Sequence, residues 1–549
     1  IDVFVKGGLV TPKTPGQIPS LLDGDEARLR RHVAAHDERA QRAAALRDVA
    51  AIPRRELPLI TLVQRQHPTN DMDIIRRAYA FAEMAHEGQL RQSGAPYFEH
   101  AYATAIVLAG WHMPPTVVAA GLLHDVPEDT KHTIADLTQH FGREIASIVE
   151  GETKISKLRY RGQERFVENL RKMFVAMADD VRVIIVKFAD RIDNLRTLAV
   201  RSPEKQHRTA LETLEIYAPI ANRLGMGEIR GELEDLAFPY VHPEEAAWVA
   251  SLVAETEEAK RAVCIALKRT VEHEFQTHHL ATVVIDGRTK HRYSLYQKLL
   301  RSDRDITKIY DLIALRIIVE DVATCYAVLG TIHQRWKPLK GRIKDYIANP
   351  KPNGYQSLHT TVFIESGDIV EFQIRTRAMH EEAEWGAAAS WRYHERTGAK
   401  LSGHQVRWVQ DLVQWQRSVT DPKEFLDGLH FDLLRDRIVI LTPNGDVIDL
   451  PEGATPIDFA YAIHSDIGNH ATGARVNGGT TLHPLDRPLE NGDMVEIIVD
   501  KKRKGPSPDW LKSIRTKHAR QKVREALRGS IHVKMAEWIS KAMPKGKKK

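Results

Sequence analysis

The spacing of apolar residues divides the chain into regions with different secondary structure. From about residue 70 to 240, apolar positions recur at helical intervals and are interrupted at Gly and Pro clusters, which predicts a set of packed helices. Between about residues 275 and 395, short β-type runs such as Ala281–Ile285 and Ile313–Val319 alternate with helical stretches. This alternation predicts a mixed α/β domain.

A third pattern begins near residue 434. The strand-type runs Arg437–Thr442 and Val447–Leu450 flank a Pro-Asn-Gly-Asp sequence, which is a strong hairpin signal. A short helix from about Pro456 to Ile463 and a closing strand, Met494–Val499, complete a small β-rich unit.

These patterns predict six segments. They are an unassigned N-terminal extension, an all-helical domain, a mixed α/β domain with a leading helical linker, a connecting helix, the β-rich unit and a basic helical tail, with boundaries 1–65, 66–240, 241–395, 396–433, 434–500 and 501–549. The chain contains no recognisable internal repeat.

The composition is that of an ordinary soluble protein and narrows the function only slightly. The chain has 549 residues, 42% of them hydrophobic and 28% charged, and no apolar run approaches the roughly 18 residues of a membrane-spanning helix. Two distant cysteines exclude a disulfide scaffold, and a reducing cytoplasm is the expected compartment. The net charge of +6 suits anionic ligands such as nucleotides or RNA, but many proteins that bind neither share it.

Three stretches of the helical region hold the first candidate chemical residues. They are Arg91–His100, His124–Thr130 and Ala189–Thr197, and each offers imidazole or carboxylate groups. Such a mixture from three helices suits a divalent cation, Mn²⁺ more naturally than structural zinc, since no Cys is offered. Taken singly, these histidines and aspartates are explained equally well as capping or surface residues, and for His100 alone that explanation is the better one.

Pro127 divides the second of these stretches. Because proline lacks a backbone donor, we expect the helix that carries His124 to end or kink there. Glu128 and Asp129 would then lie on a turn beside the metal. Two carboxylates next to a metal-activated water suit hydrolysis, since one takes the proton and the other orients the water or protonates the leaving group.

These segments resemble the HD-type hydrolase domain of the long RelA/SpoT homologues, the enzymes of the stringent response. The family signature His-Asp-x-x-Glu-Asp-Thr is intact at residues 124–130. The resemblance implies four metal ligands: His100, His124, Asp125 and Asp190. It implies four nucleotide contacts: Arg91, Ser93, Asn194 and Thr197. The chain departs from the family at Gln92, where many members have Lys, and at Asp193 and Asn222, where many have His.

A basic segment of the mixed domain, Gly287–Lys298, is expected to follow a strand and form a helix. At helical spacing Lys290, Ser294 and Lys298 share one face. Two ammonium groups and a hydroxyl could hold a triphosphate, although such a face is more often simply solvated surface.

The predicted strand Val370–Arg375 alternates apolar and polar residues. Its apolar side packs, and Glu371, Gln373 and Arg375 point to the other side. Together with Asp311, at the entry of a neighbouring strand, Glu371 could help to hold Mg²⁺. Phosphoryl-type transfer depends on positioning and charge neutralisation, which Mg²⁺, Lys and Arg supply.

The loop region Lys340–His359 carries Tyr355 between Gly354 and Gln356. An exposed ring beside amide side chains offers a stacking surface and base-edge hydrogen bonds for a purine. A polar loop with a buried Tyr explains the same pattern equally well.

This whole region is similar to the alarmone synthetase domain of the same family, which transfers pyrophosphate from ATP to the 3′ hydroxyl of GDP or GTP. The resemblance implies that Tyr355 stacks on guanine, that Asp311 and Glu371 serve Mg²⁺, and that Glu371 helps to activate the ribose hydroxyl. It implies contacts with ATP phosphates at Arg288, Lys290, His291, Ser294 and Lys298. It implies further substrate contacts at Lys344, Lys351, Asn353, Gln356, His359, Gln373 and Arg375.

Residues 436–500 resemble the TGS domain, a β-grasp module of these enzymes and of threonyl-tRNA synthetases, through the run Leu450–His464. In that family the histidine, here His464, approaches the 3′ end of uncharged tRNA on the ribosome. A mere spacer is the alternative interpretation of this unit.

The sequence thus predicts a multidomain protein with an all-α HD-type hydrolase domain, an α/β nucleotidyltransferase-like synthetase domain and a β-grasp TGS domain. The expected function is to make and to hydrolyse (p)ppGpp, with Mn²⁺ in the hydrolase and Mg²⁺ in the synthetase. Expected partners are ATP, GDP or GTP, uncharged tRNA and the ribosome, and no membrane.

Two alternatives stay open. Only one site is active in the first, because Gln92 and Asp193 depart from the hydrolase pattern and Ser390 stands where the synthetase often has His. In the second, the protein is a ribosome- and tRNA-binding nucleotide sensor without turnover. Intact Glu128 and Glu371 speak against the sensor, which would not need them.

Overall fold

The computed structural model describes most of residues 56–527. The residues outside the description are 1–55, 69, 157–162, 281–283, 288–289, 310, 352, 390–408, 411, 415, 418–420, 422–424, 426–436, 504, 517 and 528–549. The predicted N-terminal extension and connecting helix therefore fall largely outside the described residues, as do the last 22 residues of the predicted basic tail, Arg288 and Ser390. Among the described helices, none is both long and apolar enough to cross a membrane.

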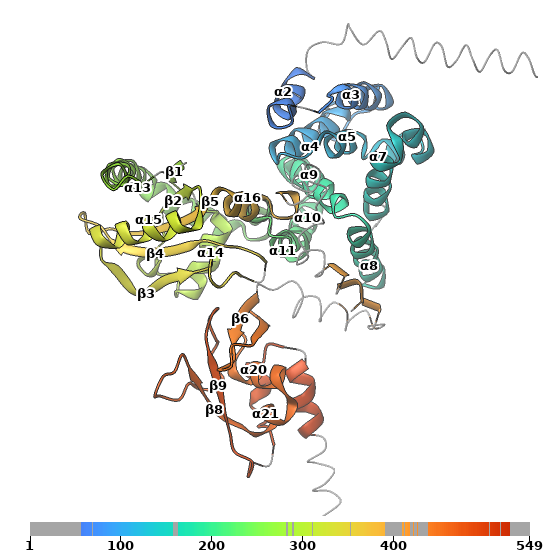
Figure 1. The fold of residues 1–549 in the computed structure, drawn as a ribbon. Coiled ribbons are helices and arrows are strands. Elements are labelled where there is room, and N and C mark those ends of the chain that lie inside the picture. Colours follow the sequence, from blue (N-terminus) through green and yellow to red (C-terminus); the bar gives the residue numbers. More distant parts are fainter. Residues whose placement is uncertain are drawn as a thin grey trace, which may run out of the picture. The chain divides into compact units, whose positions relative to one another are not determined.

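The first domain is helical, as the apolar spacing predicts (Figure 1). Its helices and short helical turns are α2 (Leu57–Gln66), α3 (Asp73–Ala85), α4 (Phe98–Gly110), α5 (Pro115–Leu123), α6 (Val126–Asp129), α7 (Ile134–Ser156), α8 (Gln163–Asp179), α9 (Arg182–Arg196), η2 (Leu198–Val200), α10 (Pro203–Glu212), η3 (Thr213–Tyr217), α11 (Ala218–Arg223) and α12 (Gly227–Val241).

Helices α5 and α9 form the centre of this domain. Every residue of α5 except Thr116 is buried, because α3, α4 and α7 all pack against it. Gly121 allows α4 to come close, since a Cβ atom there would collide with the Leu108 side chain. Helix α9 packs on α4, α5 and α7 in turn. Residues of α4, the end of α5 and α9 are thereby brought to one place.

The second domain is a mixed sheet with helices, which confirms the α/β prediction. Its strands are β1 (Val284–Gly287), β2 (Ile313–Val319), β3 (Pro338–Asp345), β4 (Leu358–Phe363) and β5 (Ile369–Thr376), in the spatial order β1-β2-β5-β4-β3. Strands β2 and β5 pair in parallel, and the other neighbours pair antiparallel. The helices of this domain are α13 (Pro243–Thr277), α14 (Arg292–Arg301), η4 (Ile306–Lys308), α15 (Val322–Arg335) and α16 (Arg377–Trp385).

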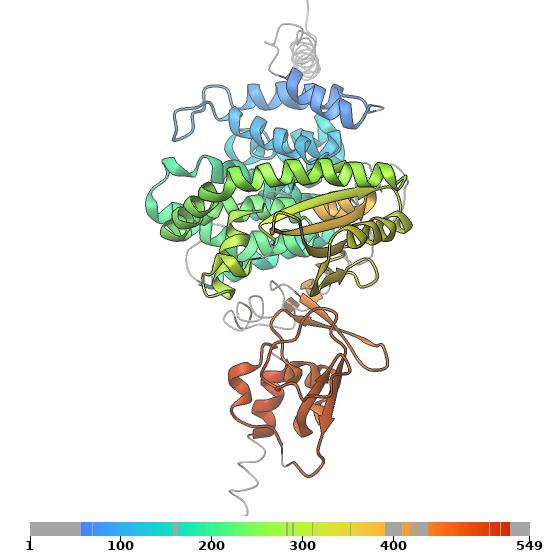
Figure 2. The ribbon, with the colours of Figure 1, turned by 90° about the vertical axis from the view of Figure 1, so that its left-hand side faces the viewer.

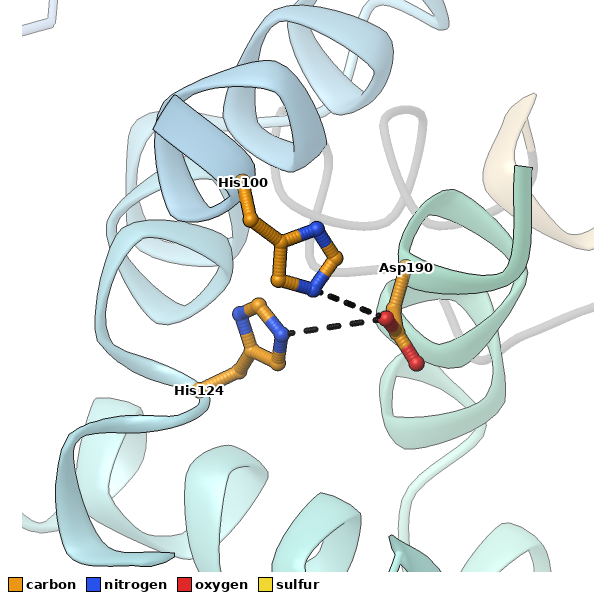
Figure 3. A group of neighbouring side chains, drawn as sticks. All are labelled: His100, His124 and Asp190. Carbon is orange, nitrogen blue, oxygen red and sulfur yellow. Dashed lines mark ion pairs between the residues drawn. The ribbon is translucent and has the colours of Figure 1, made fainter. Parts of the chain in front are cut away.

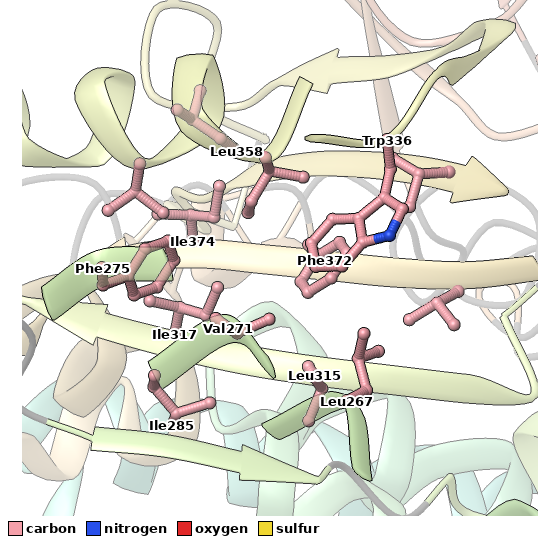
Figure 4. Packing of buried hydrophobic residues seen from close by; sticks show 14 of the residues in the cluster. Leu267, Val271, Phe275, Ile285, Leu315, Ile317, Trp336, Leu358, Phe372 and Ile374 are labelled. Carbon is pink, nitrogen blue, oxygen red and sulfur yellow. The ribbon is translucent and has the colours of Figure 1, made fainter. Parts of the chain in front are cut away.

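The core of this domain joins the sheet to helices α13 and α15. Figure 2 shows α13 running along the sheet, and Val271 of α13 and Val328 of α15 are fully buried against it. Phe372 of β5 stacks on Trp336, with ring centres 5.7 Å apart (Figure 4). Burying a side chain such as Phe372 stabilises the fold by about 1.5–3 kcal/mol. Because Phe372 takes the core side of β5, its neighbour Glu371 faces the other side, as predicted.

The third described part is the small β-rich unit. Its elements are β6 (Arg437–Leu441), β7 (Val447–Pro451), α20 (Pro456–Ile463), α21 (Ser465–His470), β8 (Ala471–Val476), β9 (Val495–Val499) and α22 (Trp510–Ser513). The predicted hairpin, helix and closing strand are confirmed, whereas β8 and α21 were not predicted. Thr455 and Asp458 begin α20 with a reciprocal capping box, and Asp458 also accepts hydrogen bonds from the backbone of Arg515 and Thr516. This aspartate therefore ties the chain beyond the sheet back to α20.

Candidate active sites

Three helices bring two histidines and an aspartate together (Figure 3). His100 lies on α4, His124 follows the last residue of α5 and Asp190 lies on α9, and all three are buried. Oδ1 of Asp190 lies 3.1 Å from Nε2 of His100 and 4.0 Å from Nε2 of His124. Oδ2 of Asp125 lies 3.5 Å and 3.3 Å from the same two nitrogens. The four predicted metal ligands therefore converge on one point.

The hydrogen bonds of the two rings leave one nitrogen of each facing this cluster. Nδ1 of His124 lies 2.8 Å from the carbonyl oxygen of Gly121 and donates to it, so its Nε2 offers a lone pair. That Nε2 is buried and has no hydrogen-bond partner among the described residues. Nδ1 of His100 lies 2.6 Å from Oδ2 of Asp193, which again leaves Nε2 for the cluster. Two imidazole nitrogens with two carboxylates are a donor set that fits a divalent cation.

Negative charge dominates the cluster. Burial lowers the pKa of His124, but Asp125 and other nearby carboxylates outweigh burial and raise that pKa to about 10. Burial likewise opposes ionisation of Asp190, yet Lys187 and the two imidazoles hold the pKa of this carboxyl well below its usual range. The cluster therefore stabilises a positive charge, which a cation can supply in place of a ring proton.

The short helix α6 places two further carboxylates beside the cluster. Helix α5 ends at Leu123, before Pro127 is reached. Pro127 lies instead in the first turn of α6, where its missing N–H is not needed. Glu128 and Asp129 therefore lie on a single helical turn. Burial, and then the charges of Glu152 and Asp125, raise the pKa of Glu128 to about 7. A carboxylate with a pKa near neutrality is suited to proton transfer.

Three of the four predicted ligands, His100, Asp125 and Asp190, line a cavity of about 360 Å³ together with Glu128 and Asp129. Arg91 and Asn194, two of the predicted nucleotide contacts, form part of its wall. Ser93 and Thr197 are not among the lining residues, and their hydroxyl groups bond to neighbouring backbone groups. The structure therefore assembles the predicted catalytic carboxylates and all predicted ligands except His124 in the wall of one cavity, with only part of the predicted nucleotide set.

Two lining residues that bond to carboxylates of the site, Tyr97 and Lys187, were missed by the sequence reasoning. The Tyr97 hydroxyl lies 2.5 Å from Oδ2 of Asp129 and donates to it. Nζ of Lys187 lies 2.9 Å from Oε1 of Glu152 and 2.7 Å from Oδ2 of Asp190. A signal existed for Lys187, which stands one helical turn before Asp190 in an otherwise apolar run. The sequence offered no comparable signal for Glu152, which is fully buried on α7.

The second site contains two lysines and an aspartate. Helix α14 begins at Arg292, so the expectation that Lys290 shares a helical face with Lys298 is wrong, because Lys290 precedes the helix. Even so, Nζ of Lys290 lies 2.6 Å from Oδ1 of Asp311, and Lys298 bonds to Oδ2 of the same carboxylate. Burial and the neighbouring charge of Lys298 lower the pKa of Lys290 to about 8, against the attraction of Asp311.

Glu371 on β5 is held in a polar network. Gln373 donates from Nε2 to Oε2 of Glu371 at 2.7 Å, and Nδ1 of His359 lies 3.3 Å from Oε1. Burial opposes ionisation, but these hydrogen bonds and nearby positive charge hold the pKa of Glu371 well below its usual range. The Tyr355 hydroxyl lies 2.8 Å from Nε2 of His359, and Nζ of Lys351 lies 5.5 Å from the centre of the Tyr355 ring. His359 therefore links Glu371 to Tyr355, and the ammonium group of Lys351 lies near the ring of that tyrosine.

Other predicted substrate residues are engaged within the protein. Nδ1 of His291 lies 2.9 Å from Oδ2 of Asp235 on α12, and Nη2 of Arg375 lies 2.7 Å from Oε1 of Glu384 on α16. Arg375 is almost fully buried. The remaining predicted contacts with described side chains are at least partly accessible: Ser294, Lys344, Lys351, Asn353 and Gln356. Their roles, like those of the residues above, stay predictions.

In the β-rich unit, His464 lies between α20 and α21. Its side chain is exposed, and its Nδ1 accepts a hydrogen bond of 3.2 Å from the backbone N–H of Asp466. The ring is therefore fixed at the surface at the start of α21. Its contact with tRNA stays a prediction.

Three parts of the chain match known families. Residues 78–227 match the HD domain, residues 287–398 match the region found in RelA/SpoT proteins, and residues 438–499 match the TGS domain. These three matches follow one another along the chain in the order that the sequence motifs predict.

Curated relatives are similar over most of the chain. A GTP pyrophosphokinase of Streptomyces coelicolor is 45% identical over 488 residues, which cover 85% of this chain and 57% of that protein. The bifunctional (p)ppGpp synthase/hydrolase RelA of Mycobacterium tuberculosis is 43% identical, over 85% of this chain and 64% of that protein. A guanosine-3′,5′-bis(diphosphate) 3′-pyrophosphohydrolase of Aquifex aeolicus is 42% identical, over 84% of this chain and 66% of that protein. The chain thus spans about three fifths of the length of these relatives.

Proposed function

We propose, because this chain belongs to the RelA/SpoT family, that it both synthesises and hydrolyses (p)ppGpp, at two separate sites. The observation that carries the proposal is that one chain contains two separate clusters of residues, each with the carboxylates that its reaction requires. One is the cavity with the His100–His124–Asp190 cluster, and the other is the network of Glu371 with the lysines around Asp311. Relatives named for each reaction support this assignment.

In the hydrolase site, water attacks the 3′ diphosphate of (p)ppGpp. The bond between ribose O3′ and phosphorus breaks, and GDP or GTP leaves with pyrophosphate. His100, His124, Asp125 and Asp190 would hold a divalent cation, for which we propose Mn²⁺ and which supplies Lewis-acid activation of water and phosphate. Glu128 accepts the proton of the attacking water and returns it to the departing O3′, while Asp129, held by the Tyr97 hydroxyl, orients the water.

In the synthetase site, the 3′ hydroxyl of GDP or GTP attacks the β-phosphorus of ATP. The bond between the α–β bridging oxygen and the β-phosphorus breaks, AMP leaves, and the pyrophosphoryl group moves to O3′. Glu371, ionised and oriented by Gln373, accepts the hydroxyl proton. Asp311 and Glu371 would also hold Mg²⁺, for which their carboxylate oxygens are suitable ligands. Lys290 and Lys298, paired here with Asp311, neutralise phosphate charge when ATP binds.

The TGS domain suggests that this enzyme binds a further ligand besides the substrates of its two sites. We infer that it contacts uncharged tRNA on the ribosome through the exposed His464. Such a contact would place the protein in the cytoplasm, where ATP, GTP and ribosomes are found together.

A pair of assays on purified protein tests the proposed function. Labelled ATP with GDP and Mg²⁺ should yield (p)ppGpp, and labelled ppGpp with Mn²⁺ should yield pyrophosphate, both resolved by thin-layer chromatography. Glu371→Gln should remove only the first activity. Turnover in one assay alone would favour the single-site alternative. Nucleotide binding without turnover in either assay would favour the sensor.

A further inference from the structure

We propose that Asp193 is a positioning residue that links Arg91, on the wall of the hydrolase cavity, to His100 in the metal cluster. This inference deepens the proposed hydrolase function and rests on it. Asp193 lies in the last turn of α9, one turn beyond Asp190. It belongs neither to the predicted ligands nor to the predicted nucleotide contacts.

One oxygen of Asp193 serves both neighbours. Oδ2 lies 2.6 Å from Nδ1 of His100 and 3.1 Å from Nη1 of Arg91. The side chain of Asp193 is 10% exposed and that of His100 is 3% exposed, so water has little access to replace either bond. Nε2 of His100 faces Asp190 and Asp125 on the opposite side of the ring. The imidazole is therefore held at both nitrogens.

This arrangement suits a histidine that binds a cation. A ring that binds through Nε2 must keep its proton on Nδ1, and the carboxylate of Asp193 is placed to accept a hydrogen bond from that proton. Such a partner fixes the tautomer and the ring orientation and makes Nε2 a better ligand. Loss of a partner of this kind typically lowers metal affinity or activity about 10–100-fold.

The contact with Arg91 extends the link to the substrate. Nη1 of Arg91 donates to Asp193, and Nη2 donates to Oδ1 of Asn194 at 2.9 Å. Nδ2 of Asn194 donates in turn to Oδ1 of Asp190. The guanidinium group is therefore tied to two cluster residues through two adjacent bridges, while it lines the cavity where an anionic nucleotide would bind.

A consequence for binding follows from these bridges. A nucleotide that binds Arg91 and shifts its position also shifts His100 and Asp190 through the two bridges. A cation that holds His100 and Asp190 in place likewise holds Arg91 in place. Because coupling between two binding events is reciprocal in free energy, each ligand should strengthen or weaken the other by the same factor. Each bridge consists of a single residue, and Asp193 carries the one that ends at a histidine of the cluster.

Asp193→Asn tests the link, because it keeps the shape of the side chain and removes its charge. Calorimetric titration of the nucleotide-free protein with Mn²⁺ should give a Kd about 10–100-fold higher than that of the parent. At saturating Mn²⁺ the kcat of ppGpp hydrolysis should recover, while KM stays raised because Arg91 has lost a partner. A merely structural role would instead lower the Tm and reduce kcat at every Mn²⁺ concentration.

Glu144→Gln is the matched control. Glu144 also pairs with an arginine of α9, Arg182, but it is not among the residues of the cluster or the cavity. This control should bind Mn²⁺ as the parent does. Synthesis of (p)ppGpp from ATP and GDP monitors the fold of each variant.

The outcomes distinguish failure of the proposed role of Asp193 from failure of the proposed hydrolase function. If the parent binds Mn²⁺ and hydrolyses ppGpp but Asp193→Asn binds Mn²⁺ equally well, the role of Asp193 is overturned and the function stands. If the parent does neither, both are overturned. Should Asp193→Asn fail to fold, Arg91→Lys decides the question from the other end of the bridge. A raised Kd for Mn²⁺ in that variant supports the link, and an unchanged Kd overturns it.

Discussion

Nδ1 of His291 lies 2.9 Å from Oδ2 of Asp235, and Nε2 of the same ring lies 3.7 Å from Oε2 of Glu228. The ring also lies against α12 at Gly231, where a Cβ atom would collide with it. A histidine expected at the phosphates of ATP thus fastens the beginning of α14 to α12.

We expect His291→Gln to destabilise the fold at neutral pH. Burial lowers the pKa of His291, but Asp235 and Glu228 outweigh burial and raise that pKa to about 10. The folded pKa therefore lies above the unfolded value of about 6.5. The stabilisation is then fully present below about pH 6.5 and is lost as the pH rises through 10.

Urea unfolding of parent and His291→Gln measures this effect. The difference in unfolding free energy should be on the order of 2 kcal/mol at about pH 6, allowing for partial solvent screening. It should shrink steadily toward pH 10. A difference that does not change with pH would contradict the ionic role of the ring.

His291 also shows where sequence reasoning stops. The spacing of Lys290 and Lys298 predicted one helical face, but α14 begins only after His291, whose partner Asp235 lies 56 residues earlier. Lys187 is a second case, because its buried partner Glu152 lies 35 residues away on α7. Neither pairing leaves a local trace in the sequence, since both depend on which helices pack together.

Other features could be predicted because they are local. Alternation along β5 fixes which side Glu371 faces, and the Asn-Gly turn with its flanking apolar runs fixes the hairpin of β6 and β7. The convergence of His100 with Asp190 followed from the family resemblance. The helix spacing alone left both as possible surface residues.

Replacing Glu128 by Gln and Asp129 by Asn together should abolish ppGpp hydrolysis. Neither residue belongs to the histidine–aspartate cluster, and both line the cavity, so they can act in proton transfer without holding the cation. The loss should be at least about 100-fold, the usual size of general acid–base contributions. Pyrophosphate release measures hydrolysis, and electron paramagnetic resonance measures bound Mn²⁺.

Mn²⁺ affinity and (p)ppGpp synthesis should stay at the parent level in this double variant. Hydrolysis at the parent rate would rule out the catalytic role of the two carboxylates. Loss of Mn²⁺ binding would show instead that they hold the cation.

Tyr355→Ala should raise the KM for GDP severalfold or more and spare hydrolysis. Stacking of a base on an aromatic ring contributes on the order of 1–3 kcal/mol. Tyr355→Phe is the matched control, because it keeps the ring and removes only the hydroxyl that contacts His359. That variant should keep its KM for GDP and lower kcat, since His359 borders Glu371. A KM in Tyr355→Ala within error of the parent would refute the stacking role.

The two sites should be antagonistic, because running both reactions at once only consumes ATP. The structure contains contacts that could carry this coupling. Nδ2 of Asn353, in the loop before Tyr355, donates to the backbone oxygen of Asn222 on α11 at 3.2 Å, and the backbone N–H of Ala387 donates to Leu224 at 2.9 Å. The helical segments on either side of the synthetase domain are the candidate movable elements: α13 is the first, and the second, at about 396–430, lies largely outside the described residues.

Calorimetric titration of a non-hydrolysable ATP analogue, with and without ppGpp and Mn²⁺, measures the coupling in the Glu128→Gln, Asp129→Asn variant, which cannot consume ppGpp. We expect ppGpp in the hydrolase cavity to weaken binding of the analogue about 5-fold or more, the lower end of typical coupling between sites. By reciprocity the analogue should weaken ppGpp binding at that cavity by the same factor. Mn²⁺ alone serves as the control, since it separates the effect of the cation from that of the nucleotide. Identical affinities in all three titrations would mean that the two sites work independently, because a shared conformational equilibrium cannot leave either affinity unchanged.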